Sequence, residues 1–187
     1  MDAPAETLTV NTTAPTLDLD RLFLDHYAGA ARLIGRIVRD PARAEELAVE
    51  VFLKLWQEPR ERVLAPEGWV YRTAARTALN ELRAQSRRTQ YERLFPFLQR
   101  TPTPEEIASA NQEQARVRAV LRAMKPGQAE LLLLRSHGLS YEELASSLNL
   151  NPASVGTLLS RAQQAFRKEH VKRYGEQSGS ESRCVGR

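Results

Sequence analysis

The residues with the most suggestive chemistry in this chain lie at helical spacing between positions 69 and 88, a stretch that contains five Arg and one Glu. Residues three or four positions apart share one face of a helix. That face would carry an aromatic ring followed by cationic and amide groups: Trp69, Arg72, Arg76, Asn80, Arg83 and Arg87. Guanidinium groups bind phosphates and aromatic rings stack on unpaired bases, so the stripe predicts a contact with single-stranded nucleic acid. Taken alone, it also fits a solvated helix face.

A second candidate site is a helix-turn-helix nearer the C-terminus. Ser140 and Glu143 have the spacing of a capping box, in which each side chain satisfies a free amide at the start of a helix. Asn149 suits the left-handed turn that would follow, and Asn151-Pro152 suits the cap and first residue of the next helix. A plain helical hairpin would show the same spacing.

In a helix-turn-helix, the first residues of the second helix lie in the DNA major groove. The residues expected at base edges or phosphates are mostly small or polar: Asn151, Ala153, Ser154, Gly156, Thr157, Ser160 and Arg161. Between Arg116 and Tyr174, ten Lys or Arg accompany four Glu, which favours a surface that faces phosphates.

A charged stripe on an earlier predicted helix is a candidate protein-docking surface. Glu46, Glu50 and Lys54 are four residues apart and lie opposite an apolar face that ends at Trp56, which we expect in the core. An acidic surface can orient a basic partner. Alone, the stripe is more typical of a solvated face, where a Glu–Lys pair contributes only a few tenths of a kcal/mol.

Catalytic and metal chemistry are not indicated. The single cysteine, Cys184, rules out an intrachain disulfide and a Cys-based zinc cluster, and the three histidines are scattered. No phosphate-binding loop or nucleophile elbow is present. We therefore expect neither an enzyme nor a bound cofactor.

Composition and hydropathy place the chain among soluble globular proteins. It has 187 residues, of which 42% are hydrophobic and 27% charged, and its net charge is +4. No apolar run approaches the roughly 20 residues that span a bilayer. The acidic, polar first residues do not resemble a secretory signal, so a cytoplasmic location is expected.

Apolar periodicity predicts an all-α protein with two small helical domains. We expect helices over 19–38, from about 41 to 56, 66–88, 105–124, 126–136, 140–148 and from 152 onward. Prolines at 96, 102 and 104 predict a flexible linker over 89–104 between domains at 18–88 and 105–174. Residues 1–17 and 175–187 are expected to be disordered tails. Trp69 fits either packing against the first domain or a place on the nucleic-acid surface.

Several motifs, taken in order, resemble the extracytoplasmic-function (ECF) sigma factors. The segment from Asp40-Pro41 to Trp56 resembles the region 2 signature of that family, and Trp69 to Arg83 resembles the segment after it. Residues 125–135, 138–145 and 155–161 resemble region 4. The chain departs from the common family pattern at Val49, and at Leu159 and Gln164, where basic residues are common.

The resemblance implies a role for each surface. It implies that Glu46, Glu50, Leu53 and Lys54 bind the clamp helices of the largest subunit of core RNA polymerase. The arginine stripe would recognise and melt the minus-ten promoter element. The helix-turn-helix would read the minus-thirty-five element, with the flap of the second-largest subunit as a further partner and an anti-sigma factor as a regulator.

Two other functions are compatible with the sequence. One is a dimeric helix-turn-helix regulator that binds a palindromic site without polymerase. The other is a sigma-like decoy that binds an anti-sigma factor but no promoter, which Leu159 and Gln164 suggest.

Overall fold

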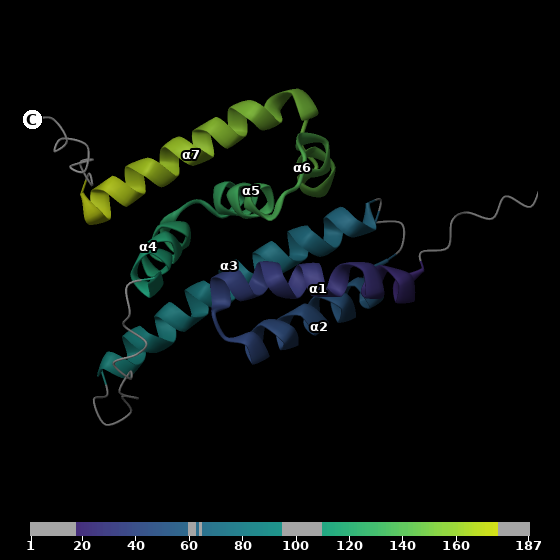
Figure 1. Cartoon of the computed structure of the whole chain (residues 1–187), viewed down its shortest axis with the longest axis horizontal. Coiled ribbons are helices and arrows are strands. Elements are labelled where there is room, and N and C mark those ends of the chain that lie inside the picture. The colour runs from purple at the N-terminus through teal and green to yellow at the C-terminus, as the bar shows by residue number, and fades with distance from the viewer. Residues whose placement is uncertain (1–17, 60–62, 64, 95–109, 176–187) are drawn as a thin grey trace, which may run out of the picture.

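The computed structural model describes residues 18–59, 63, 65–94 and 110–175, and this part of the chain is entirely helical (Figure 1). An N-terminal unit comprises α1 (Leu19–Val38), α2 (Pro41–Gln57) and α3 (Pro66–Leu94). A C-terminal unit comprises α4 (Ala110–Ala123), α5 (Pro126–His137), α6 (Tyr141–Leu148) and α7 (Pro152–Tyr174). The all-α prediction with two helical units is confirmed.

Short polar caps fix the ends of the first two helices. The Arg21 amide donates to Asp18 Oδ1 at 3.0 Å at the start of α1, and the Arg43 amide donates to Asp40 Oδ1 at 3.1 Å at the start of α2. Between these helices Arg39 adopts a left-handed conformation, with φ of 62°, and ends α1. Asp40-Pro41 therefore stops one helix and starts the next, as the sequence predicts.

The core of the N-terminal unit lies where α1 and α2 pack on α3. Ile34, Val51, Val70 and Leu79 are almost completely buried there. Three small residues of α3 are fully buried as well and allow close helix approach: Ala74, Ala75 and Ala78.

The third helix is longer than expected. It continues to Leu94, six residues past the predicted end at position 88 and into the expected linker. Thr89 stays helical, with its hydroxyl donating to the Gln85 carbonyl at 3.0 Å. No Gly or Pro interrupts 89–94, so the first strong helix breaker is Pro96. The rest of the expected linker, the start of the predicted 105–124 helix and both expected tails, apart from Gly175, lie outside the described residues.

The C-terminal unit contains the predicted helix-turn-helix. Glu143 N–H donates to Ser140 Oγ at 3.2 Å, and Ser140 N–H donates to Glu143 Oε2 at 2.6 Å, which confirms the capping box. Asn149 is left-handed, with φ of 53°, and Asn151 caps α7. Leu144, Ala145 and Val155 are buried where α6 and α7 meet.

The two units pack against each other. In Figure 1 the C-terminal unit lies along one side of α3, and the contacts that join them run mainly from α3 to α5 and α6. A further link comes from α1, where Arg36 Nη1 donates to the Ser136 carbonyl at 3.2 Å.

The two tryptophans occupy different environments. Trp56 is 74% exposed, so its expected place in the core is wrong. The buried stripe of α2 is narrower than the apolar pattern, because Ala44, Leu47 and Leu55 already fill the contact with its neighbours. Trp69 is half-buried and packs against a core cluster that includes residues of both units, so its place on the nucleic-acid surface stays a prediction.

Within the described residues, no helix combines the length and apolarity needed to cross a bilayer. The same part of the chain has no group of three or more His, Cys, Asp or Glu placed to hold a metal ion.

Candidate functional site

The arginine stripe of α3 lies along the side of the helix that meets the C-terminal unit. Arg76 is largely exposed but its Nε donates to both carboxylate oxygens of Glu130 in α5, each at 3.1 Å. Arg72 is half-buried, and burial together with the neighbouring Arg76 charge lowers its pKa. Burial disfavours the charged form of Arg72, and an anion bound beside it would reduce that cost.

Farther along α3 the stripe turns toward solvent. Asn80 and Arg87 are exposed, while Arg83 is half-buried with its Nη2 atom enclosed and without a hydrogen-bond partner. The Arg83 side chain would have to change conformation before this donor could reach a phosphate or base oxygen. The structure thus places the predicted residues on one helix, but it gives Arg76 a partner in the other unit.

The predicted DNA-reading residues occupy the start of α7. Six of the seven are exposed and one, Ser154, is half-buried; the exposed ones are Asn151, Ala153, Gly156, Thr157, Ser160 and Arg161. Asn151 Oδ1 accepts a hydrogen bond from Ala153 N–H at 3.0 Å, so its side chain is used as a helix cap. The free positions therefore begin at Ala153.

Two positions that depart from the common sigma-factor pattern differ in location. Leu159 is only 4% exposed and belongs to the core between the helices, whereas Gln164 lies on the surface. A buried leucine cannot contact DNA, so the lack of a basic residue at Leu159 does not weaken DNA binding. This finding removes one of the two observations that suggested a decoy.

The acidic residues of α2 form an ion-pair network. Arg43 Nη1 lies 2.9 Å from Glu46 and 3.7 Å from Glu50, and its Nη2 lies 3.2 Å from the buried Glu81 of α3. Arg88 pairs with Glu81 at 2.7 Å. Hydrogen bonds to Glu46 and Glu81 raise the pKa of Arg43. The network fixes α2 on α3 and reduces the acidic character of this surface.

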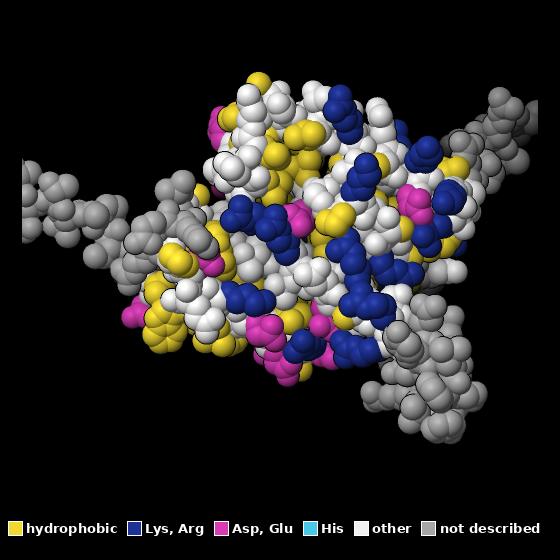
Figure 2. Space-filling view, turned by 180° about the vertical axis from the view of Figure 1, so that it is seen from behind, with side chains coloured by type: hydrophobic (Ala, Val, Ile, Leu, Met, Phe, Trp, Pro, Cys, Tyr) yellow, Lys and Arg dark blue, Asp and Glu magenta, His cyan; other side chains and the backbone are white. Residues whose placement is uncertain are grey.

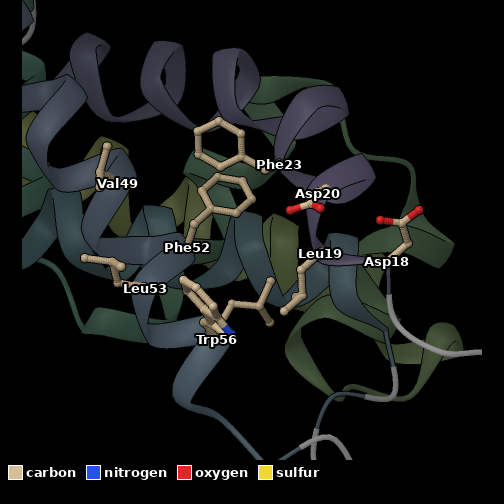
Figure 3. Close-up of a pocket in the computed structure, with 9 residues that line it drawn as sticks. Asp18, Leu19, Asp20, Phe23, Val49, Phe52, Leu53 and Trp56 are labelled. Carbon is tan, nitrogen blue, oxygen red and sulfur yellow. The ribbon is translucent and has the colours of Figure 1, made fainter.

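Beside the acidic residues lies an apolar groove that the sequence did not reveal (Figure 3). It has a volume of about 480 Å³ and runs between the start of α1 and the end of α2. Its exposed apolar side chains are Phe23, Val49, Leu53 and Trp56, with Asp18 and Asp20 at one end. The rings of Phe23 and Phe52 meet edge to face at 4.9 Å between centroids. Val49, Leu53 and Trp56 recur at three- and four-residue steps, and this second stripe was the available sequence signal.

Basic side chains extend over both units. The face opposite that of Figure 1 carries dark-blue Lys and Arg side chains over a broad area, with acidic side chains in smaller groups between them (Figure 2). Such a distribution favours a polyanionic partner that contacts both units.

Two family models match the chain: the one described as sigma-70 region 2 covers residues 22–88, and the one described as sigma-70 region 4 covers residues 114–165. The chain is 29% identical over 167 residues to the RNA polymerase sigma-H factor of Pseudomonas aeruginosa, covering 80% of this chain and 84% of that protein. It is 27% identical to the ECF RNA polymerase sigma factor SigE of Mycolicibacterium smegmatis, covering 86% and 65%.

Among solved structures, one match is the sigma factor RpoE of Bartonella quintana, crystallised in complex with the anti-sigma factor NepR. The match has a TM-score of 0.46 and 17% identity, and it covers 82% of this chain and 97% of that one. Because regions 2 and 4 occur in order along an all-helical chain, this protein belongs to the extracytoplasmic-function sigma factors of the sigma-70 family, non-enzymatic subunits that direct RNA polymerase to initiate transcription at promoters.

Proposed function

We propose that this sigma factor divides its contacts among three surfaces. The end of α2, with the groove beside it, binds the clamp helices of the largest polymerase subunit. The arginine face of α3 binds and melts the minus-ten element, and the start of α7 reads the minus-thirty-five element. The observation that carries the proposal is the exposed groove with Trp56 at its edge, because soluble proteins rarely expose a contiguous apolar patch unless it binds a partner.

The polymerase contact combines apolar and charged groups. Leu53 is 47% exposed in the groove, and Glu46, Glu50 and Lys54 lie on the same helix beside it. An apolar centre with a charged rim is the usual anatomy of a specific protein interface. Large aromatic residues often carry much of the binding energy of such interfaces, and Trp56 is the candidate here.

The promoter contacts follow from charge and exposure. A melted strand needs cations along its phosphates, which Arg72, Arg83 and Arg87 supply, and Asn80 adds a polar group on the same face. In region 4, Thr157, Ser160 and Arg161 are exposed in the first turns of α7, where a recognition helix approaches base edges.

Control by an anti-sigma factor is also part of the proposal. An apolar groove of about 630 Å³ crosses from α1 to region 4, lined by Ile37, Leu121 and Phe166 among others and bordered by Arg36, Arg135 and Arg167. None of the described residues that line it is acidic. This surface suits an amphipathic helix that carries acidic residues. We expect the anti-sigma factor to present such a helix. Region 4 is also expected to contact the polymerase flap.

The proposal is tested by mixing the purified chain with sigma-free bacterial core polymerase and a genomic promoter library. We expect a stable complex and discrete transcription start sites, and the promoters recovered would define both DNA elements. A matched pair of variants then separates the surfaces: Trp56→Ala should weaken core binding, and Arg87→Gln should weaken promoter opening with core binding intact. Absence of a complex, or protection of equal half-sites without polymerase, would overturn the proposal.

A further inference from the structure

The last helix, α7, extends beyond the part of the chain that the region 4 model matches. The match ends at residue 165, whereas α7 continues without a break to Tyr174 (Figure 1). It ends where the Gly175 amide donates to the Val171 carbonyl at 2.8 Å. The added turns, residues 166–174, contain four Lys or Arg and one Glu. The match therefore assigns no role to the strongly basic end of the helix whose start is proposed to read DNA.

One side of these added turns holds them against α4. Phe166, His170 and Tyr174 follow at four-residue steps; the first two rings stack with 6.2 Å between centroids, and the last two lie 5.3 Å apart. The guanidinium carbon of Arg116 in α4 lies 5.4 Å from the centre of the Tyr174 ring. His170 Nε2 lies 3.9 Å from Glu113 Oε1, also in α4. These contacts fix the end of α7, so the fold sets the direction in which its other sides point.

The opposite side of the added turns carries two lysines. With about 3.6 residues per turn, residues two positions apart point to nearly opposite sides of a helix. Lys168 and Lys172 therefore point away from His170 and from α4, and both are exposed. Within the described residues, neither lysine has a hydrogen bond or an ion pair.

The two arginines of the added turns are already engaged elsewhere. Arg173 Nε donates to Glu169 Oε1 at 2.7 Å, an ion pair within the helix. Arg167 borders the groove between α1 and region 4 that is proposed for the anti-sigma factor. The helix dipole favours cations in the last turn, but it does not select a side of the helix. Lys168 and Lys172 are thus left on one side, with their charges available to a partner.

That side continues the face proposed to read DNA. Its exposed residues follow at steps of three or four: Thr157, Arg161, Gln164, Lys168 and Lys172. With a rise of about 1.5 Å per residue, the two lysines lie about 10 and 16 Å beyond Arg161 along the helix axis. The major groove is about 12 Å wide and about 8.5 Å deep, and the phosphates of both strands border it. A helix whose first turns reach the bases passes these phosphates in its next turns, where the lysines lie.

We propose that the C-terminal turns of α7 bind the phosphate backbone of the duplex beside the minus-thirty-five element through Lys168 and Lys172, independently of base sequence. The inference rests on the proposed function of α7 as the helix that reads this element. A lysine ammonium is a point charge on a flexible stem, which suits phosphates in any sequence context. Phosphate contacts position a protein on the duplex, whereas base contacts specify the site. Arg161 is the one cation among the predicted reading residues, so the two lysines supply electrostatic affinity that the start of α7 lacks.

The salt dependence of promoter binding tests the proposal. Polymerase assembled from core enzyme and the full chain is bound to a duplex promoter recovered from the library, at salt concentrations from about 50 to 200 mM. Each neutralised phosphate contributes about 0.9 to the slope of log K against log salt, so Lys168→Gln and Lys172→Gln together should reduce the slope by about 1.8. The affinity deficit of this double variant should then shrink about twelvefold between the lowest and the highest salt concentration. A promoter with a scrambled minus-thirty-five element and an intact minus-ten element should show the same change in slope.

Neighbouring positions provide a matched control. Lys172→Gln and Arg173→Gln each remove one exposed cation from the last turn, but Arg173 is already paired with Glu169. Lys172→Gln should reduce the slope by about 0.9, and Arg173→Gln should leave it unchanged. All variants should keep wild-type helicity and wild-type affinity for core polymerase, because the substituted side chains are exposed.

The possible outcomes separate this inference from the proposed function. Equal slopes for the double variant and the wild type would overturn the phosphate contact while promoter recognition stood. A change in slope confined to the intact minus-thirty-five sequence would indicate base readout, and weaker core binding would indicate that the lysines face an acidic surface of the polymerase; either result would overturn the proposal. Equal binding of intact and scrambled elements by the wild-type polymerase would overturn the proposed function of α7 and the inference with it.

Discussion

Related sigma factors often carry basic residues at the positions of Leu159 and Gln164. Because Leu159 is buried and Gln164 is exposed, we predict opposite effects when arginine is introduced at each position. Leu159→Arg should unfold region 4, and Gln164→Arg should strengthen DNA binding. Leu159 is 4% exposed in the core of region 4, and truncating such a leucine to alanine costs about 2–5 kcal/mol. Arginine at this position would lose the same packing and add a buried charge with no acidic partner.

These magnitudes are large for a domain of this size. At about 0.05–0.15 kcal/mol per residue, the 66 residues from 110 to 175 have a free energy of unfolding of roughly 3–10 kcal/mol. The arginine variant should therefore lose much of its region 4 helix, whereas Gln164 is exposed and its substitution should change stability by less than about 0.5 kcal/mol.

Circular dichroism during urea titration measures the first effect, and binding to a duplex minus-thirty-five element at several salt concentrations measures the second. One additional phosphate contact in Gln164→Arg should steepen the salt dependence by about 0.9 in the logarithmic slope. The reasoning is refuted if Leu159→Arg keeps wild-type helicity and binds the duplex more tightly, because the side chain would then face DNA.

Three further predictions follow from the other surfaces. Trp56→Ala should leave the urea midpoint unchanged, because the ring is 74% exposed, yet raise the Kd for core polymerase about tenfold or more, measured by fluorescence anisotropy. Burial and the charges of Arg36 and Arg32 lower the pKa of His137 below its ordinary 6.5, so the closed domain arrangement binds fewer protons than an open one. The packing of the two units is then fully stable above pH 6.5 and weakens as the pH falls from there toward the lowered pKa of His137. Small-angle scattering should show that the protein expands at pH 5.5, and the His137→Gln variant should not expand. Hydrogen bonds from Ser140 lower the pKa of Glu143, so the capping box stabilises α6 above about pH 4.5 and is lost as the pH falls; Ser140→Ala should cost about 1 kcal/mol at pH 7 in thermal unfolding and less at pH 3.5.

The groups around His137 decide how its contribution to the pH effect on closure is tested. Tyr71 faces it from α3, Arg32 and Arg36 from α1, and Glu67 and Glu143 line the cavity beside it. Burial raises the pKa of Tyr71 further above 10. Carboxylates titrate near pH 4. A second imidazole, that of His26 in α1, lines the same cavity and lies 3.2 Å from the Tyr71 hydroxyl, so His26→Gln is the matched control. An expansion that persists in His137→Gln, or disappears in His26→Gln, would contradict the assignment.

Local signals in the sequence were sufficient to predict the helix caps and the turns between helices. Asp40-Pro41, the Ser140–Glu143 box and Asn149 act on backbone groups within four residues, so no distant contact could override them. The end of α3 was missed because residues 89–94 contain no Gly or Pro, and extending an existing helix adds one hydrogen bond for each residue fixed.

Exposed surfaces and the interface between the units were harder to predict, because they depend on which helices pack together and on how much of each helix face is covered. The apolar pattern of α2 is wide enough to include Trp56, but α1 and α3 cover only part of that width, and the uncovered edge became a groove. Glu130 gave no signal at all. It sits in an apolar helix beside Leu131, and its partner Arg76 is identifiable only when two distant helices are placed together.

Arg76 connects the domain arrangement to promoter binding through a single charge. In the closed protein it neutralises Glu130, and on DNA it would neutralise a phosphate, so opening transfers the cation from one anion to another. The exchange leaves Glu130 exposed to solvent, where an ionised carboxylate is well hydrated. The loss of the ion pair is thereby partly offset by rehydration of Glu130, and by the phosphate at Arg76 once DNA is bound. Domain opening and strand capture would then be thermodynamically linked steps, since a promoter strand at Arg76 removes the donor of the Arg76–Glu130 ion pair.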